Sequence, residues 1–201
     1  MADGQNNIIE TVRCAWAEQN DLERVYHDTE WGVPCHDSQK LFEKLCLEGA
    51  QAGLSWDTIL RKRDEYRRVF HNFDIKKVAH MTDRELEDIL RNSSVVRNRL
   101  KIFSVRKNAL AVQEIMKTQD FADYIWSFVG GKTVQNNWHD MSEIPASTDV
   151  SECMSKDLKK RGLTFVGPTI CYAFMQSMGI VNDHVVSCFR HREVKNMGGK
   201  L

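Results

Sequence analysis

The stretch KKRGLTFVGPTICYAFM, residues 159–175, decides the fold. A basic helix ends at Gly162, a tight apolar turn follows, and a second helix begins at Pro168, because glycine favours helix ends and proline the first helical position. Backbone N–H groups that are left free at such a turn and helix start point outward and suit a phosphate. The stretch therefore predicts two helices joined by an anion-binding turn.

Helix signals also dominate the rest of the chain, and few stretches alternate with the period of a strand. Thr82 and Glu85 form a capping-box pattern. Gly130 and Gly131 end a segment that starts at Asp120, and a loop is expected over 130–147. The other predicted helices cover residues 39–53, 55–70, 98–116, 148–162 and 168–179. Asp37 or Ser38 is expected to cap the first of these, and Ser55 the second. We expect an all-α fold.

The charge of the chain is balanced but unevenly distributed. Lys plus Arg and Asp plus Glu each number 28, so net charge alone gives no support for nucleic-acid binding. Residues 97–107 carry five positive charges and no acid, and residues 156–162 carry four basic residues and one acid. A solvated helix face is the ordinary explanation for either run.

No apolar run approaches the length that spans a bilayer, about 18–20 residues, and the start MADGQNNIIE lacks the pattern of an export signal. We therefore expect a cytoplasmic protein without membrane contact. Its six cysteines are then expected to be reduced, which favours metal binding over disulfides.

One candidate metal motif lies in VNDHVVSC, residues 181–188, where His184 and Cys188 are four apart and would share one face of a helix. Chance alone yields about 0.2 such pairs in a chain of this composition, so a core cysteine and a surface histidine are an open alternative. Cys14 and His27 could complete a Cys2His2 set, which suits tetrahedral zinc. Four other cysteines and five other histidines compete for these places.

A carboxylate also lies on the apolar side of a predicted helix. In the helix from Gln39 the apolar stripe is Leu41, Phe42, Leu45 and Cys46, and Glu48 lies two turns beyond Leu41, whereas Gln39, Lys40, Glu43 and Lys44 are expected to face outward. A Glu at the stripe edge that reaches water or pairs with an Arg is one interpretation. The other is a pocket in which Glu48, Leu54 and Trp56 receive a flat cation.

The whole stretch from about Val12 to Cys188 resembles the bacterial 3-methyladenine DNA glycosylase I family, the constitutive enzyme of the helix-hairpin-helix superfamily. The motifs that carry the resemblance are RCAW, YHDTEWGVP, LEGAQAGLSW, ADYIWSFV, SEIPAST, LKKRGLTFVGPTICYAFMQ and NDHVV. It implies one all-α glycosylase unit over residues 1–201, with the helix-hairpin-helix at about 149–179. One structural zinc would join residues 12–30 to 182–190 through Cys14, His27, His184 and Cys188. Four protein ligands leave no open position for catalysis.

The resemblance also implies a function and a site. The enzyme would be a monomer that extrudes 3-methyladenine from duplex DNA and hydrolyses its glycosidic bond without cutting the strand. Glu48 would be the catalytic group and would hold the base together with Tyr26; Trp16, Trp56 and less directly Trp31 would form the stacking walls. Leu54 would enter the gap in the duplex. The DNA backbone would be held by Lys160, Arg161, Gly162, Leu163, Thr164, Phe165, Val166 and Gly167.

The sequence departs from the wider superfamily at two places. Where most members have a catalytic Asp two residues before a His, this chain has Asn182, and Asp183 is one place late. Phe165 stands where the first glycine of the hairpin is usual. Both departures are shared by the 3-methyladenine branch. A DNA-binding module without activity and a zinc hydrolase that uses the Cys/His set are the rival functions.

Overall fold

The computed structural model describes residues 11–197. The first ten residues and the last four lie outside the described part. The expectation that the start carries no export signal concerns residues outside it, and the expected unit of 1–201 is described only over residues 11–197. Within residues 11–197 no helix is both long and apolar enough to cross a membrane.

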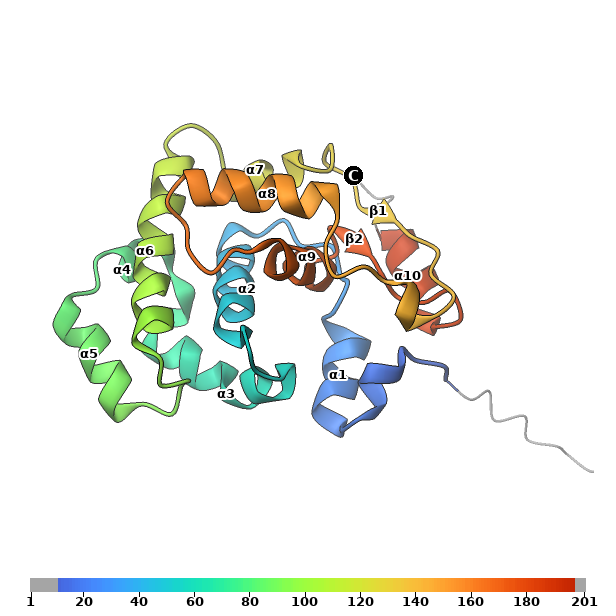
Figure 1. The fold of residues 1–201 in the computed structure, drawn as a ribbon, viewed down its shortest axis with the longest axis horizontal. Helices are drawn as coiled ribbons and strands as arrows, with labels where there is room; N and C mark the ends of the chain where they lie inside the picture. Colours follow the sequence, from blue (N-terminus) through green and yellow to red (C-terminus); the bar gives the residue numbers. More distant parts are fainter. Residues whose placement is uncertain (1–10, 198–201) are drawn as a thin grey trace, which may run out of the picture.

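Helices make up nearly all of the regular structure, in agreement with the expected all-α class (Figure 1). The α-helices of the described residues are α1 (Asp21–Thr29), α2 (Ser38–Gln51), α3 (Trp56–Val69), α4 (Ile75–Ala79), α5 (Asp83–Asn92), α6 (Arg99–Met116), α7 (Phe121–Ser127), α8 (Asp149–Lys160), α9 (Pro168–Ser177) and α10 (Phe189–Met197). Three short 3-10 helices are η1 (Ala15–Glu18), η2 (His71–Phe73) and η3 (Met141–Glu143). Two short strands, β1 (Val134–Gln135) and β2 (Val181–Asn182), pair in parallel.

Helix α2 lies at the centre and packs against α3, α6, α7 and α9. Its predicted apolar stripe is buried, and Glu48 is buried with it at 5% exposure. The expectation that Lys44 faces outward is wrong, since its side chain is buried. The reason is that neighbours surround the second half of α2 on every side, so that no face of it is left for water.

The two helices of the opening stretch are α8 and α9, joined by a turn at 161–167, with Pro168 as the first helical residue after Gly167. Leu163 and Val166 turn their side chains into the core, and the Ser155 hydroxyl donates to the carbonyl of Val166 at 2.6 Å. Phe165 has φ +56, the left-handed conformation that glycine adopts without strain. Phe165 therefore has a backbone conformation that usually favours glycine.

The two ends of the described chain meet beside β2. The amide of Phe189 donates to the carbonyl of Val12 at 3.1 Å. His184 and Cys188, which the spacing rule would place on one helix, lie instead in a turn between β2 and α10. Their convergence thus comes from the path of a loop rather than from helical periodicity.

Most capping predictions are confirmed, because local side-chain oxygens decide them. Asp37, Ser55 and Thr82 each accept a hydrogen bond from the backbone of the helix that follows, and the capping box of Thr82 and Glu85 is complete. The predicted loop at 130–147 contains β1 and η3. Helices α1, α4 and α10 and the β1–β2 pair were not predicted, since each is short.

Gly179 provides a test of this packing. It has φ +66, and a methyl group there would lie 2.5 Å from the carbonyl oxygen of Gly32. Gly130 also has φ +66 but has open space around it. We predict that Gly130→Ala lowers the free energy of unfolding by about 1–2 kcal/mol, the cost of the left-handed backbone alone. Gly179→Ala should cost at least about 2 kcal/mol more, from overpacking. Urea unfolding measures both, and equal losses would contradict the close packing.

Candidate functional site

A pocket of about 270 Å³ opens between α1, α2, α9 and the loop around η3. This volume is just below the roughly 300–1,000 Å³ of pockets for drug-sized ligands, so the pocket suits a small flat molecule. All five pocket residues expected from the sequence line it, namely Trp16, Tyr26, Trp31, Glu48 and Trp56. The lining residues that the sequence did not indicate are Glu23, Gln51, Met141, Ile144, Ala173 and Gln176.

The aromatic walls come from the first part of the chain. Trp16 lies in η1, Tyr26 in α1, and Trp56 is the first residue of α3. The ring centroids of Trp16 and Trp31 are 5.3 Å apart, as are those of Tyr26 and Trp56. Tilted and edge contacts at this distance hold the rings in fixed positions. The pocket is therefore largely formed before any ligand enters.

Glu48 is one of two buried carboxylates that line the pocket, the other being Glu23. Burial raises its pKa from an ordinary 4.5 to about 7, against the attraction of the Lys44 charge. A contact with the Ser177 hydroxyl also acts to lower the pKa of Glu48. This hydroxyl donates its hydrogen to the carbonyl of Phe174 at 3.0 Å, so it gives the Glu48 carboxylate little support. A buried carboxylate with so little compensation favours a positively charged or hydrogen-bond-donating ligand.

Lys44 contacts two of the rings that line the pocket, and the sequence did not indicate it. Its Nζ donates to the Tyr26 hydroxyl at 2.9 Å and lies 4.5 Å from the centroid of the Tyr26 ring and 4.6 Å from that of Trp56. Burial lowers the pKa of Lys44 to about 8. The contact shows that these two rings already face a positive charge inside the protein.

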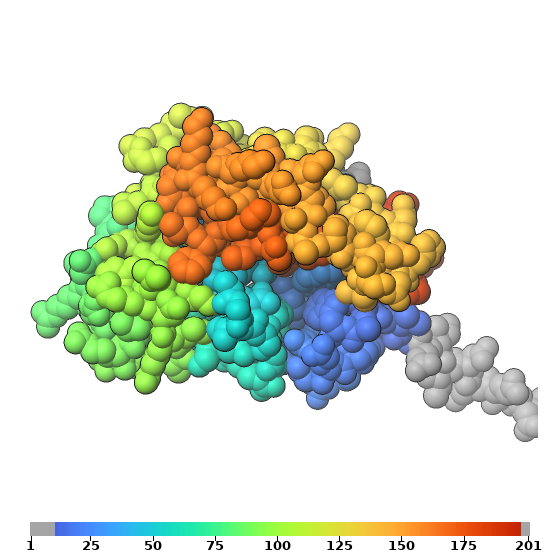
Figure 2. Space-filling view, viewed as in Figure 1, coloured from blue at the N-terminus to red at the C-terminus, as the bar shows by residue number. Residues whose placement is uncertain are grey.

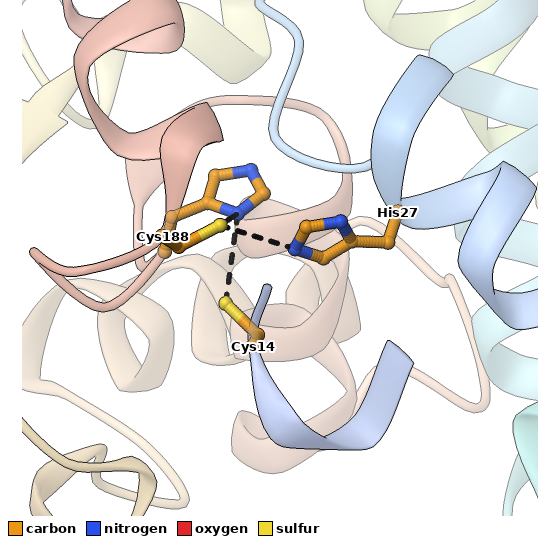
Figure 3. Close-up of side chains that lie close together, drawn as sticks. Cys14, His27 and Cys188 are labelled. Carbon is orange, nitrogen blue, oxygen red and sulfur yellow. Dashed lines mark hydrogen bonds between the residues drawn. The ribbon is translucent and has the colours of Figure 1, made fainter. Parts of the chain in front are cut away.

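The four residues expected to bind metal converge at one point beside the pocket (Figure 3). All are buried, and their ligand atoms lie within 4.8 Å of one another. Cys188 Sγ is 3.4 Å from His27 Nε2 and 3.6 Å from His184 Nδ1, and Cys14 Sγ is 3.7 Å from His184 Nδ1. The cluster could hold one metal ion.

Further contacts orient both imidazoles. His27 Nδ1 lies 2.8 Å from Asp28, whose carboxylate also accepts two hydrogen bonds from the Arg13 guanidinium. His184 Nε2 lies 3.2 Å from the carbonyl of Trp31. A carboxylate or carbonyl behind each histidine is the usual support of metal-binding imidazoles. Both nitrogens that face the cluster are therefore fixed in direction.

The charge states in the cluster also suit a cation. The hydrogen bond shared by the two thiols lowers the pKa of Cys188 and raises that of Cys14, so the pair retains one proton that a metal would displace. Burial lowers the pKa of His184, which favours the neutral imidazole that binds metals.

The cluster and the pocket share their walls. The Trp16 ring meets His27 edge-on at 5.3 Å, and the Trp31 ring meets His184 edge-on at 4.6 Å. Two of the pocket's aromatic side chains thus pack directly on two of the histidines.

Asp183, which follows Asn182 in the sequence, does not line the pocket. It is fully buried and accepts four side-chain hydrogen bonds, each between 2.6 and 2.8 Å, from Asn136, Trp138, Tyr172 and Gln176. Burial and the hydrogen bond to Asp183 together raise the pKa of the Tyr172 phenol. All of its acceptor positions are used, so Asp183 joins the loop after β1 to α9.

The two segments expected to contact DNA are visible on one face of the molecule, where Figure 2 shows the turn at 161–167 in orange near the α2–α3 turn in cyan. Leu54 is 41% exposed in that turn. Lys160 is exposed, whereas Arg161 is paired with Asp157 at 2.7 Å.

The hairpin amides fall into two groups. Those of Gly162, Leu163 and Thr164 bond within the protein, to Lys159, Leu158 and Asn108. Among the described residues the amides of Phe165, Val166 and Gly167 have no partner. Free amides at the start of α9 can receive an anion.

The raised pKa of Glu48 has a consequence for stability. A carboxyl group with a higher pKa in the folded state stabilises the fold below its ordinary pKa, and this contribution is lost as pH rises towards 7. We predict that Glu48→Gln becomes more stable relative to wild type between pH 5 and 7.5, by on the order of 2 kcal/mol. Urea unfolding at both pH values measures this difference. The control is Glu114→Gln, at a side chain that is 69% exposed; an equal trend there would contradict the prediction.

The chain is similar to known proteins of one family. The profile of the methyladenine glycosylase family matches residues 16–191. The DNA-3-methyladenine glycosylase of Haemophilus influenzae is 51% identical over 179 residues, which are 89% of this chain and 97% of the relative. A crystal structure of 3-methyladenine DNA glycosylase I matches with a TM-score of 0.86 at 49% identity, covering 89% of this chain and 98% of the other. The Staphylococcus aureus enzyme, described for its recognition of 3-methyladenine, matches with a TM-score of 0.85 at 32% identity over 88% and 95% of the two chains. This chain belongs to the methyladenine glycosylase family.

Proposed function

We propose that this protein is a DNA repair glycosylase that hydrolyses the N-glycosidic bond of 3-methyladenine in alkylated duplex DNA. The relatives named above are glycosylases of this base. The observation that carries the proposal is the pocket itself, in which three tryptophans and a tyrosine lie together with two buried carboxylates, Glu23 and Glu48. This combination recognises a flat, positively charged ring system.

The chemistry of the substrate fits the pocket. Methylation at N3 places a positive charge on adenine and weakens its glycosidic bond, so the enzyme must extrude the nucleotide, bind the cation and admit water. Stacking against Trp16 or Trp56 contributes on the order of 0.5–2 kcal/mol through the cation–π interaction. Glu48 accepts a hydrogen bond from the exocyclic amine. Unmethylated adenine has no charge and loses the cation–π attraction.

The reaction leaves an abasic site and does not cut the strand. A base that already carries a positive charge leaves readily, so water suffices and no lysine nucleophile is required. Lys44 would not act as such a nucleophile, because its amine donates to the Tyr26 hydroxyl and lies over the rings of Tyr26 and Trp56. We therefore assign Lys44 no covalent step.

Two exposed elements would hold the duplex. Leu54, at the turn after α2, would fill the gap that the extruded base leaves, as apolar wedges do in other DNA complexes. The hairpin would bind the backbone through its three unpartnered amides, with Lys160 and Arg161 adding positive charge. Val166 is buried and would contribute only through its free amide, whereas Leu163 is buried and its amide is bonded to Leu158.

The cluster of Cys14, His27, His184 and Cys188 would hold one structural zinc. A tetrahedral site with Zn–S near 2.3 Å and Zn–N near 2.0–2.1 Å separates sulfur from nitrogen by about 3.5 Å, close to the three distances of 3.4–3.7 Å found here. A zinc hydrolase is disfavoured because four buried protein ligands leave no position for water. The single glycosylase unit, the helix-hairpin-helix at 149–179, the monomer and the cytoplasmic location remain predictions.

The zinc proposal predicts one metal ion per chain. Cys188→Ser should lose most of the bound zinc in elemental analysis and should unfold at lower urea, since the ligand set joins both ends of the chain. Cys153→Ser is the control, because Cys153 is an exposed cysteine outside the cluster. Full zinc content in Cys188→Ser would reject the ligand set.

The proposed activity predicts release of free 3-methyladenine from methylated duplex DNA, identified by chromatography of the purines. Glu48→Gln should slow release by roughly 10- to 150-fold, the equivalent of about 1.5–3 kcal/mol for a lost charge-assisted hydrogen bond. Some activity should survive because methylation itself weakens the bond. Glu114→Gln should release the base at the wild-type rate. If the wild type binds DNA but releases no purine, the protein is a binding module instead.

A further inference from the structure

The basic run at 97–107 contains one lysine that does not face water. Lys101 is 9% exposed, and its Nζ donates to the carbonyls of Ala50 at 2.9 Å and Ala52 at 2.6 Å. In the same run Arg99 pairs with Glu87, and Lys107 is exposed. The solvated-face interpretation therefore fails for Lys101, whose charge is directed into the protein.

The two carbonyls that Lys101 binds belong to the end of α2. Ala50 lies in the last turn and Ala52 is the C-terminal cap, and Gly53, with φ +77, and Leu54 follow directly. The last carbonyls of a helix have no partner within it and carry partial negative charge, so an ammonium group there both satisfies and attracts them. Lys101 thus anchors the turn that presents Leu54.

Two helical turns further along α6, Asn108 holds the hairpin in the same way. Its amide nitrogen donates to the carbonyl of Thr164 at 3.0 Å, and its carbonyl accepts from the Thr164 amide at 2.9 Å. Asn108 is 3% exposed. Seven residues of α-helix separate the two anchor points by about 10.5 Å along the axis.

The hairpin and α2 are also in direct contact. A methyl group added at Gly49 would lie 3.0 Å from Cβ of Phe165 and 3.1 Å from its carbonyl oxygen. The ribbon shows the hairpin passing between α6 and α2 (Figure 1). The turn with Leu54 and the hairpin are therefore fixed to one helix and to each other.

We propose that Lys101 is a positioning residue that sets the place of Leu54 relative to the hairpin. This rests on the proposed function, in which Leu54 enters the duplex while the hairpin holds the backbone. A wedge helps extrusion only if it meets the base step at a fixed distance from the held phosphates. Lys101 provides that distance by tying the end of α2 to the helix that also carries Asn108.

The test compares base release from methylated duplex DNA with release from the same strand alone, in single turnovers at saturating enzyme. Lys101→Met keeps the length of the side chain and removes the ammonium group. We expect release from the duplex to fall about tenfold and release from the single strand to stay within about twofold, because an unpaired base needs little help to leave the stack. Equal losses on both substrates would overturn the proposal.

Lys107→Met is the matched control, since it removes one exposed positive charge from the same helix. It should leave the ratio of duplex to single-strand rates unchanged; a fall equal to that of Lys101→Met would mean that only charge matters and would overturn the proposal. Lys101→Gln, which can still donate to a carbonyl, should give an intermediate ratio and serves if Lys101→Met fails to fold.

A double-mutant comparison with Leu54→Ala separates positioning from other effects. If Lys101 acts through Leu54, Lys101→Met should lower the duplex rate in the wild-type background and change it little in the Leu54→Ala background. Independent, multiplying losses would overturn the proposal. Failure of the wild type to release any base would instead reject the proposed function, so the two failures are distinguishable.

Discussion

The meeting of four side chains from opposite ends of the chain is the constraint on which the pocket depends. Cys14 and His27 come from the start, and His184 and Cys188 from the end, and all four are buried around one point. A metal ion bound by all four would close a loop of about 150 residues, which in the chain-entropy picture is worth on the order of 5 kcal/mol. Such a link would hold η1 and α1 against the helical core, and those segments carry Trp16 and Tyr26.

The pocket lies between the N-terminal segment and helices α2 and α3. One wall, with Trp16, Tyr26 and Trp31, belongs to the anchored segment, and the other, with Glu48 and Trp56, belongs to α2 and α3. Trp31 and Trp16 rest directly on the histidines of the cluster. Preformed walls reduce the ordering that a ligand must impose, which is how rigid sites gain affinity.

The sequence predicted the helices with strong caps and also the pocket residues, but for different reasons. Caps at Asp37, Ser55 and Thr82 depend on neighbours within four residues, so local patterns suffice. The pocket and cluster residues were assigned through family motifs, since nothing local places Cys14 beside Cys188. Lys44 and Lys101 could not be predicted as buried, because each appears on a polar helix face and only tertiary contacts supply its partners.

Helix α10 and the strands were missed because a two-residue strand and a nine-residue helix of low apolar content have no clear period. The turn that carries His184 and Cys188 was missed for the same reason. Their spacing of four suits a helix, but β2 ends just before them and its pairing with β1 directs the chain elsewhere.

The four hydrogen bonds on Asp183 have a consequence for the fidelity of the proposed repair. A carboxylate that is fully engaged with Asn136, Trp138, Tyr172 and Gln176 is unavailable to stabilise positive charge on a sugar. Cleavage then relies on the weakness that alkylation has already introduced into the substrate. An intact adenine that strays into the pocket would remain attached to its strand, so undamaged genetic information is protected by the strength of its own bond.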